Sequence, residues 1–347
     1  MSTPREPASL PLVGRPAEDL FREMSDRRRS DIDWRAARTF SLVYPTGRDD
    51  VDEVLARAAH DVVFENALNP LRFPSLGLME REVIEMTGSL LGVPPTGGGV
   101  FTSGGTESIV MSVLSAREKF RARGGVGGRV VTPISAHPAF AKAAHLLGLE
   151  HVTTPLDDDF RANVPAWLSE LRDDTVLTMG SAYSYPHGVI DPIAAMADAA
   201  GERDIPFHTD ACIGGFVLPF LNELGVTVPG WDFRVPGVTQ ISADVHKYGY
   251  ATKGASVITY RDRADLRAQI FTYHEWPGGM YRTPGVAGAR AASPIAAAWA
   301  VMNYLGRAGY ATLVADLQAT TGAPGGSIDR KSTRLNSSHV KRSRMPS

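Results

Sequence analysis

The sequence contains very little cysteine and no long apolar segment. Cys212 is the single cysteine among 347 residues, which excludes an intrachain disulfide framework and is typical of proteins from a reducing compartment. No run of about 18 apolar residues occurs that could span a bilayer, and the N-terminal residues lack the apolar core of an export signal. We therefore expect a cytoplasmic protein without an integral membrane segment.

The sequence also lacks an excess of either charge. Its 36 Lys and Arg residues nearly balance 38 Asp and Glu residues, for a net charge of −2. This balance argues against the strongly basic surface with which proteins bind nucleic acids or anionic membranes, and no metal site is predicted. Hydrophobic residues make up 43% of the chain, enough for a sizeable buried core. We expect a globular protein that acts on a small molecule.

The order of apolar and polar residues predicts an α/β fold. Residues 1–75 are rich in Arg and Pro and predict an N-terminal arm, whereas residues 76–320 predict one large domain of alternating helices and strands. Such alternation is typical of a mainly parallel sheet covered by helices on both faces. The predicted helices are 51–68, 79–92, 106–125, 139–148 and 192–204, and the predicted strands are 129–135, 175–182, 205–211, 238–244 and 255–261.

The last segment, residues 327–347, differs from everything before it. It is polar, basic and without periodicity, which predicts a disordered or non-native tail. Its phrase RKSTRLNSSH resembles translated sequencing adaptor. We therefore expect the natural protein to be longer, with a natural disordered basic tail as the alternative.

Three motifs place reactive groups at the ends of predicted elements. FTSGGTES at 101–108 has a glycine pair at a helix start, where backbone N–H groups and the helix dipole favour a phosphate. FHTDACIGG at 207–215 ends a strand in Asp210, and an ionised Asp can stabilise a protonated pyridine nitrogen. SADVHKYGYATKG at 242–254 contains Lys247, whose amine can form a Schiff base with an aldehyde. Each motif alone also suits an ordinary turn or surface charge, but together they predict a site for pyridoxal 5′-phosphate (PLP).

These motifs also carry a resemblance to a known family. The chain resembles the PLP-dependent enzymes of fold type I, specifically the group II decarboxylase superfamily, and within it most closely the sphingosine-1-phosphate lyases. The segments that carry the resemblance are NPL at 69–71, TSGGTES at 102–108, AHPAFAKAA at 136–144, GSAYSYPHGVIDPI at 180–193, HTDACIGGF at 208–216, DFRVPGVTQISADVHKYGYATKG at 232–254 and GGMYRTPGVAGAR at 278–290. The resemblance implies a fold type I architecture, of which we expect the C-terminal small domain to be largely missing from this chain.

The resemblance implies roles for individual residues. Lys247 would hold PLP as a Schiff base, Asp210 would pair with the pyridine nitrogen, and His137 would stack on the ring. Lys253 matches a lysine that serves bond cleavage in the lyases. The remaining positions implied to bind the cofactor are Gly105, Thr106, His208, Ser242, His246 and Gly279, of which the last would reach the phosphate in the neighbouring subunit.

The implied reaction breaks a carbon–carbon bond. The substrate would be a phosphorylated long-chain β-hydroxy amine of sphingolipid metabolism, and the products an aldehyde and phosphoethanolamine. A tyrosine assists proton transfer in the family, and the alternatives Tyr183 and Tyr185 both stay open. An amino-acid decarboxylase, acting in carboxylic acid metabolism, is the first alternative function, and a truncated inactive fragment is the second. The resemblance also implies a homodimer, because active sites of the family lie at the subunit interface.

Overall fold

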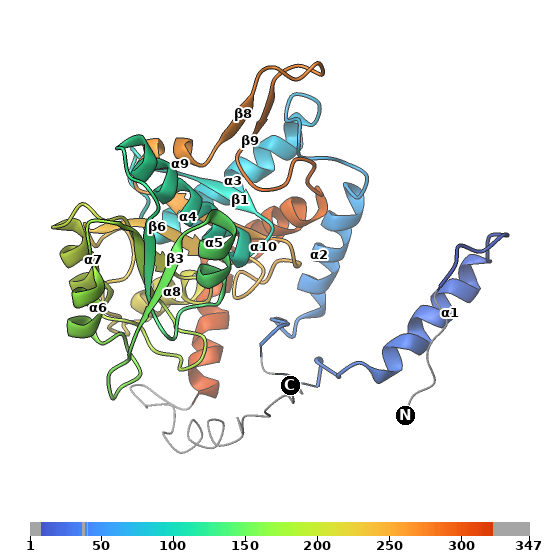
Figure 1. Cartoon of the computed structure of the whole chain (residues 1–347). Coiled ribbons are helices and arrows are strands. Elements are labelled where there is room, and N and C mark those ends of the chain that lie inside the picture. The colour runs from blue at the N-terminus through green and yellow to red at the C-terminus, as the bar shows by residue number, and fades with distance from the viewer. Residues whose placement is uncertain (1–7, 37–38, 40, 322–347) are drawn as a thin grey trace, which may run out of the picture. The chain divides into compact units, whose positions relative to one another are not determined.

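A computed structural model of the chain describes residues 8–36, 39 and 41–321 (Figure 1). The tail predicted at 327–347 lies outside the described residues. The chain forms two compact units, residues 1–47 and 48–347. The first unit holds helix α1 (Ala17–Arg27) and the short helix η1 (Arg28–Ser30), and the second unit holds the other helices and all strands. The predicted division into an arm, 1–75, and a large domain, 76–320, stays a prediction.

Seven strands of the second unit form one sheet in the order β1-β7-β6-β5-β4-β2-β3. Neighbouring strands from β3 to β6 are parallel, and β7 runs antiparallel to both β1 and β6. The predicted α/β fold with a mainly parallel sheet is therefore confirmed. The strands are β1 (Gly98–Thr102), β2 (Arg129–Pro133), β3 (Glu150–Thr154), β4 (Thr175–Ser181), β5 (Phe207–Asp210), β6 (Val238–Ala243) and β7 (Ser256–Tyr260).

Helices surround this sheet, and a small hairpin of β8 (Phe271–Tyr273) and β9 (Tyr281–Thr283) stands apart from it (Figure 1). The predicted helix 79–92 begins earlier, at Pro74, because proline suits the first turn of a helix. It ends at the predicted glycine, Gly92, whose φ of 71° glycine adopts without strain. The helices are α2 (Asp49–Asp61), α3 (Pro74–Leu91), α4 (Gly105–Ala122), α5 (Ala139–Leu147), α6 (Val164–Glu170), α7 (Ile193–Gly201), η2 (Gly214–Phe216), α8 (Leu218–Glu223), α9 (Arg263–Ala268) and α10 (Ser293–Thr320).

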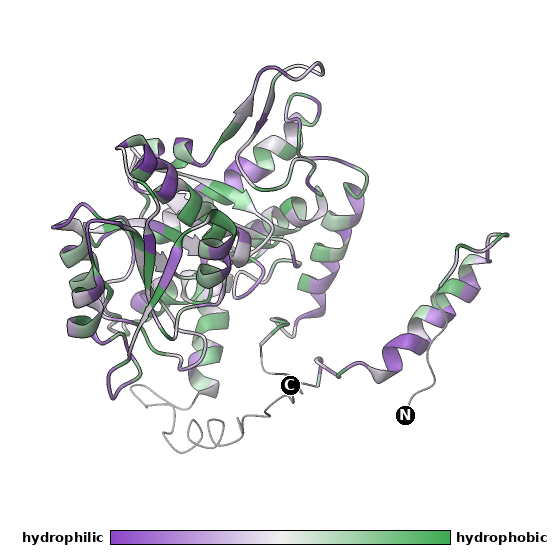
Figure 2. Ribbon diagram, in the orientation of Figure 1, coloured by the Kyte–Doolittle hydropathy of each residue, from purple (hydrophilic) through white to green (hydrophobic). Residues whose placement is uncertain are grey.

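Strand β5 shows which helices cover which face of the sheet. Phe207 packs in the larger buried cluster, which also contains residues of α3 and α10, whereas the His208 ring contacts Ser112 of α4 and Phe140 of α5. Because successive residues of a strand point to opposite faces, α4 and α5 cover the face opposite to α3 and α10. Figure 2 shows α10 as mostly hydrophobic (green), as expected for a helix that packs on a sheet and on other helices. Asp210 points to the α4 face, since it follows His208 by two residues.

No helix among the described residues combines the length and the apolar character that a membrane crossing requires.

Candidate active site

A cavity of about 360 Å³ lies beyond the carboxyl ends of β4, β5 and β6. Ligands of open α/β sheets bind at this edge, and the volume falls within the range of small-molecule sites. The cavity brings together most of the site residues predicted from the sequence, although they come from segments far apart in the chain. Its walls consist of Ser103, Gly104, Gly105, Thr106, Glu107, Ile109, His137, Ser181, Tyr183, Tyr185, Asp210, Cys212, Ile213, Asp244, His246 and Lys247.

The turn between β1 and α4 forms one wall of the cavity. Helix α4 begins at Gly105, so that backbone N–H groups of its first turn, which have no partner within the helix, lie at the cavity. A side chain at position 105 would not fit, because its Cβ would lie 2.8 Å from the Cys212 sulfur. Glu107 fixes the turn by accepting hydrogen bonds from the backbone N–H (2.7 Å) and hydroxyl (2.6 Å) of Ser103. The helix start offers a site for an anion such as phosphate.

Asp210 ends strand β5 and presents a buried carboxylate to the cavity. Its Oδ1 accepts hydrogen bonds from the backbone N–H of Cys212 (3.1 Å) and from the Ser242 hydroxyl (3.4 Å). Ser242 lies directly opposite Asp210 in the register of β5 and β6. These contacts fix one carboxylate oxygen, and the side chain is held toward the ligand space.

His208 and Ser242 lie behind Asp210 and do not line the cavity. The Nε2 of His208 lies 2.9 Å from the Ser242 hydroxyl, and its Nδ1 lies 2.8 Å from the Ser112 hydroxyl. Burial lowers the pKa of His208 to about 4, so the imidazole is neutral at physiological pH. Each ring nitrogen thus meets one hydroxyl, and Ser112 in turn donates a hydrogen bond to the side-chain oxygen of Gln240. His208 and Ser242 support Asp210, and the direct cofactor contacts predicted for them stay predictions.

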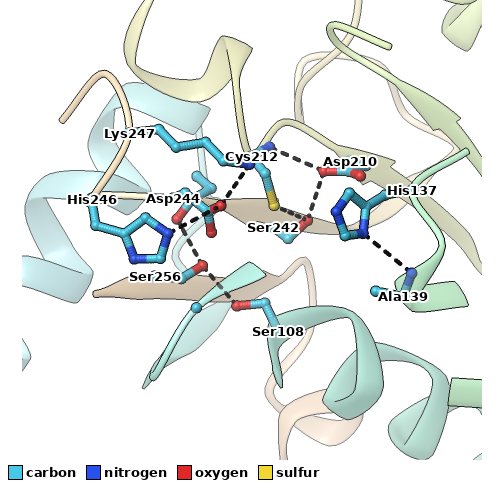
Figure 3. Close-up of polar contacts among 12 residues, drawn as sticks. Ser108, His137, Ala139, Asp210, Cys212, Ser242, Asp244, His246, Lys247 and Ser256 are labelled. Carbon is cyan, nitrogen blue, oxygen red and sulfur yellow. Dashed lines mark hydrogen bonds and ion pairs between the residues drawn. The ribbon is translucent and has the colours of Figure 1, made fainter. Parts of the chain in front are cut away.

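Lys247 follows β6 and extends its amine into the cavity (Figure 3). Its Nζ lies 2.9 Å from the Asp244 carboxylate. Burial by itself lowers the pKa of this amine, but Cys212, Asp244 and Asp210 outweigh burial, so that the pKa lies above its ordinary value. In this arrangement the amine carries a proton at neutral pH.

His137, Tyr183 and Tyr185 complete the walls of the cavity. His137 precedes α5, and its Nδ1 accepts a hydrogen bond from the backbone N–H of Ala139 (3.2 Å), which fixes the ring. Burial, and to a smaller extent the nearby Tyr248, raise the pKa of Tyr183 to about 12, so its phenol keeps its proton at neutral pH. Tyr185 is more exposed than Tyr183, and the geometry brings both hydroxyl-bearing side chains to the cavity.

Lys253 and Gly279 also lie outside the cavity wall, as His208 and Ser242 do. Lys253 donates a hydrogen bond to the backbone carbonyl of His246 (3.0 Å), so it contacts the Lys247 segment from behind. Burial lowers the pKa of its amine. Gly279 lies in the turn of the β8–β9 hairpin and adopts a φ of 98°. Asp244, which the sequence motifs did not single out, also contacts Lys247. Its only signal in the sequence is its place directly after a strand and three residues before the lysine.

The cavity residues fit PLP. A phosphate is a suitable ligand for the start of α4, where only glycine leaves room beside Cys212 and Asp244. Lys247 supplies an amine for the cofactor aldehyde, and the Asp210 carboxylate supplies a negative charge for a protonated ring nitrogen. His137 supplies a ring for stacking. The cavity thus offers a suitable protein group for the phosphate, the aldehyde, the ring nitrogen and the ring face of PLP.

The chain is similar to known lyases over most of its length. It is 40% identical over 309 residues to the sphingosine-1-phosphate lyase of Arabidopsis thaliana, covering 87% of this chain and 56% of that relative. It is 38% identical over 303 residues to sphingosine-1-phosphate lyase 1 of Rattus norvegicus, covering 87% and 53%. The chain therefore spans about half the length of the curated relatives it matches.

A solved structure and a conserved domain agree with these relatives. The sphingosine-1-phosphate lyase of Burkholderia pseudomallei matches with a TM-score of 0.87 and 39% identity, over 90% of this chain and 74% of that one. The resemblance stated from the sequence is thereby confirmed. The conserved domain of pyridoxal-dependent decarboxylases matches residues 4–321. Since this match extends over far more than half of the chain, the protein belongs to the family of pyridoxal-dependent decarboxylases, whose cofactor is PLP.

Proposed function

We propose that the chain carries the active site of a PLP-dependent carbon–carbon lyase. Its substrate is a phosphorylated long-chain β-hydroxy amine of the sphingosine-1-phosphate type, and its products are an aldehyde and phosphoethanolamine. The observation that carries the proposal is the 39% identity, over 90% of the chain, to a solved bacterial sphingosine-1-phosphate lyase. A role in sphingolipid metabolism and a cytoplasmic location belong to the same proposal.

Different residues of the cavity have different roles in this reaction. When bound, PLP supplies an electron sink for the electron pair of the broken carbon–carbon bond. The N–H groups of Gly105 and Thr106 hold its phosphate, and Lys247 provides the amine of attachment. The Asp210 carboxylate would stabilise positive charge at the ring nitrogen, and His137, whose ring is fixed by the backbone N–H of Ala139, would stack on the cofactor ring.

Proton transfer falls to the tyrosines and to Lys253. A base must remove the proton of the substrate hydroxyl, and an acid must return a proton to the carbon that keeps the amine. Tyr183 holds its proton at neutral pH, which suits the acid. Burial lowers the pKa of the Lys253 amine, which suits the base, but to reach the substrate this amine has to leave the His246 carbonyl outside the cavity wall. Tyr185, at the same cavity, is the alternative acid.

The proposal predicts which products the purified chain releases. Incubated with PLP and sphingosine 1-phosphate, it should release a long-chain aldehyde and phosphoethanolamine in equal amounts, measured by mass spectrometry. Phosphoethanolamine alone should change the visible absorption of the bound cofactor, because it is the amine product. Both signals should depend on added PLP.

Other products would favour the alternative functions. The matching domain is that of decarboxylases, which favours an amino-acid decarboxylase as the second candidate. Release of CO2 from one amino acid, without aldehyde from the phosphorylated amine, would overturn the lyase in favour of that candidate. A chain that binds PLP at no concentration would instead be an inactive fragment.

We propose in addition that the chain forms a homodimer through the β8–β9 hairpin. Four large apolar side chains of the hairpin are exposed: Phe271, Tyr273, Trp276 and Met280. Exposed apolar groups that gather on one projecting element are typical of protein interfaces. The predicted approach of Gly279 to the cofactor phosphate of a partner subunit would follow from this contact.

Sedimentation velocity tests the dimer. The unaltered chain should sediment at twice the monomer mass, and the double variant Trp276→Ser/Met280→Ser should sediment as a monomer, because it loses apolar area from the contact. The control Val126→Ser removes an even more exposed apolar side chain from another loop and should leave the dimer intact. A monomeric unaltered chain at micromolar concentration would contradict the proposal.

A further inference from the structure

Asp244 is a buried carboxylate that none of the roles above explains. Its side chain is 2% exposed, yet it lines the cavity. Oδ2 lies 2.9 Å from the Lys247 amine and 3.6 Å from His246 Nε2. Oδ1 has no hydrogen-bond partner among the described residues. Burying a carboxylate oxygen without a partner costs free energy, so a residue with this geometry requires a reason beyond packing.

The surroundings of Asp244 favour its negative charge and its position. A Cβ at Gly105 would lie 2.9 Å from each carboxylate oxygen, so the start of α4 approaches Asp244 as closely as glycine allows. The N-terminus of a helix stabilises a nearby negative charge. The same helix start is the proposed site of the cofactor phosphate. Asp244 therefore holds Lys247 (Figure 3), and both line the cavity at the proposed phosphate site.

We propose that Asp244 is a positioning residue that holds the Lys247 ammonium in the cavity before PLP binds, and that attachment of PLP requires this ion pair to break. Attachment joins Nζ to the aldehyde carbon as a C=N bond, and the aldehyde oxygen leaves as water. The ammonium must first release a proton to solvent, because only the neutral amine has the electron pair that attacks the aldehyde. Asp244 thus sets the pH at which the empty chain accepts its cofactor.

The sign of this effect follows from the charges around the amine. Burial opposes the ammonium, whereas Cys212, Asp244 and Asp210 stabilise it. Neutralising Asp244 removes a stabilising charge at 2.9 Å, so the pKa of Lys247 falls and attachment proceeds at lower pH. The titratable groups that face Lys247 from the surrounding elements are Glu107, His137, Tyr183, Tyr185, Asp210, Cys212, Asp244, His246 and Lys253.

The test measures attachment of PLP across a pH series. The chain is purified without cofactor and mixed with PLP, the C=N bond is reduced with borohydride, and peptide mass spectrometry quantifies the label. In the unaltered chain, half-maximal labelling of Lys247 should require a higher pH than labelling of Lys142, which is exposed on α5. In Asp244→Asn the Lys247 midpoint should fall by about one pH unit or more, which is about a tenfold rise in rate below the midpoint.

Two further variants make the outcome decisive. Asp204→Asn makes the same change of charge at an exposed position paired with Arg123, and it should leave the Lys247 midpoint unchanged. Asp244→Ser removes the carboxylate with a smaller side chain and serves if Asp244→Asn fails to fold. Equal midpoints at Lys247 and Lys142 in the unaltered chain, or an unchanged Lys247 midpoint in the Asp244 variants, would overturn the inference.

The inference rests on the proposed function only through the cofactor aldehyde. If PLP labels Lys247 at no pH, the cofactor site itself is wrong. If labelling occurs but its pH midpoint is the same in the unaltered chain and in the Asp244 variants, only the role of Asp244 is wrong. Product analysis with sphingosine 1-phosphate tests the reaction separately, so the two failures are distinguishable.

Discussion

Replacing Lys247 with Arg is expected to abolish covalent attachment of PLP and to lower turnover by at least about 10³-fold. Arginine keeps the positive charge beside Asp244, so the ion pair that holds the segment after β6 survives. The guanidinium, however, stays protonated at every physiological pH and cannot attack an aldehyde. The variant therefore separates the charge of the side chain from its role as an amine.

Absorption spectroscopy and mass spectrometry check this prediction. Lys247→Arg mixed with PLP should show neither the visible band of the attached cofactor nor a borohydride-stable label on the peptide that contains position 247. Lys142→Arg, the same substitution on the exposed surface of α5, should retain both signals and full turnover. Attached cofactor in the Lys247 variant would mean that another lysine carries it.

The sequence predicts the central strands that carry the site better than it predicts the two edge strands of the sheet. Strands β4, β5 and β6 are short and almost wholly buried, and they lie in segments in which apolar residues recur between predicted helices, which makes them recognisable. Strand β1 begins with glycines, which have low strand propensity, and β3 is an edge strand with a mixed pattern. Neither strand gives a periodic signal, and both are absent from the predicted elements.

The sequence also predicts which motifs meet at the cavity better than it predicts which side chains line it. Asp210 and Lys247 follow neighbouring parallel strands, so their meeting is expected from topology. His208 lies on the same face of β5 as Asp210, but two residues earlier in the strand and under α4 and α5. It therefore lies behind Asp210 instead of beside the ligand space. Lys253 lies outside the cavity wall, where its amine donates to the backbone carbonyl of His246.

Asp210 is held by a buried chain of polar groups that reaches from α4 to the cavity. Ser112, His208 and Ser242 follow one another at 2.8 and 2.9 Å, and Ser242 then donates to Asp210. A neutral imidazole transmits no charge, so this chain orients the carboxylate without neutralising it. The hydrogen-bonded chain therefore fixes the direction in which the carboxylate points, toward the ligand side.

Asp210→Asn is accordingly expected to lower turnover by about 10²- to 10³-fold while PLP stays attached to Lys247. Asparagine has almost the same shape, and its amide oxygen can still accept the hydrogen bonds of Cys212 and Ser242. Only the negative charge is lost, and with it the stabilisation of a protonated ring nitrogen on which the electron sink depends. In this variant PLP attachment should therefore persist while turnover falls.

Two readouts decide whether the Asp210 charge acts in this way. The borohydride label at Lys247 should match that of the unaltered chain, whereas aldehyde release should fall by the stated factor. Asp198→Asn, an identical substitution on the exposed face of α7, should change neither quantity. If label and turnover fell together in Asp210→Asn, the carboxylate would be holding the fold of the cavity, and its assignment to the ring nitrogen would be wrong. Asp210→Glu, which restores the charge on a longer side chain, should then recover turnover only if charge is what the reaction requires.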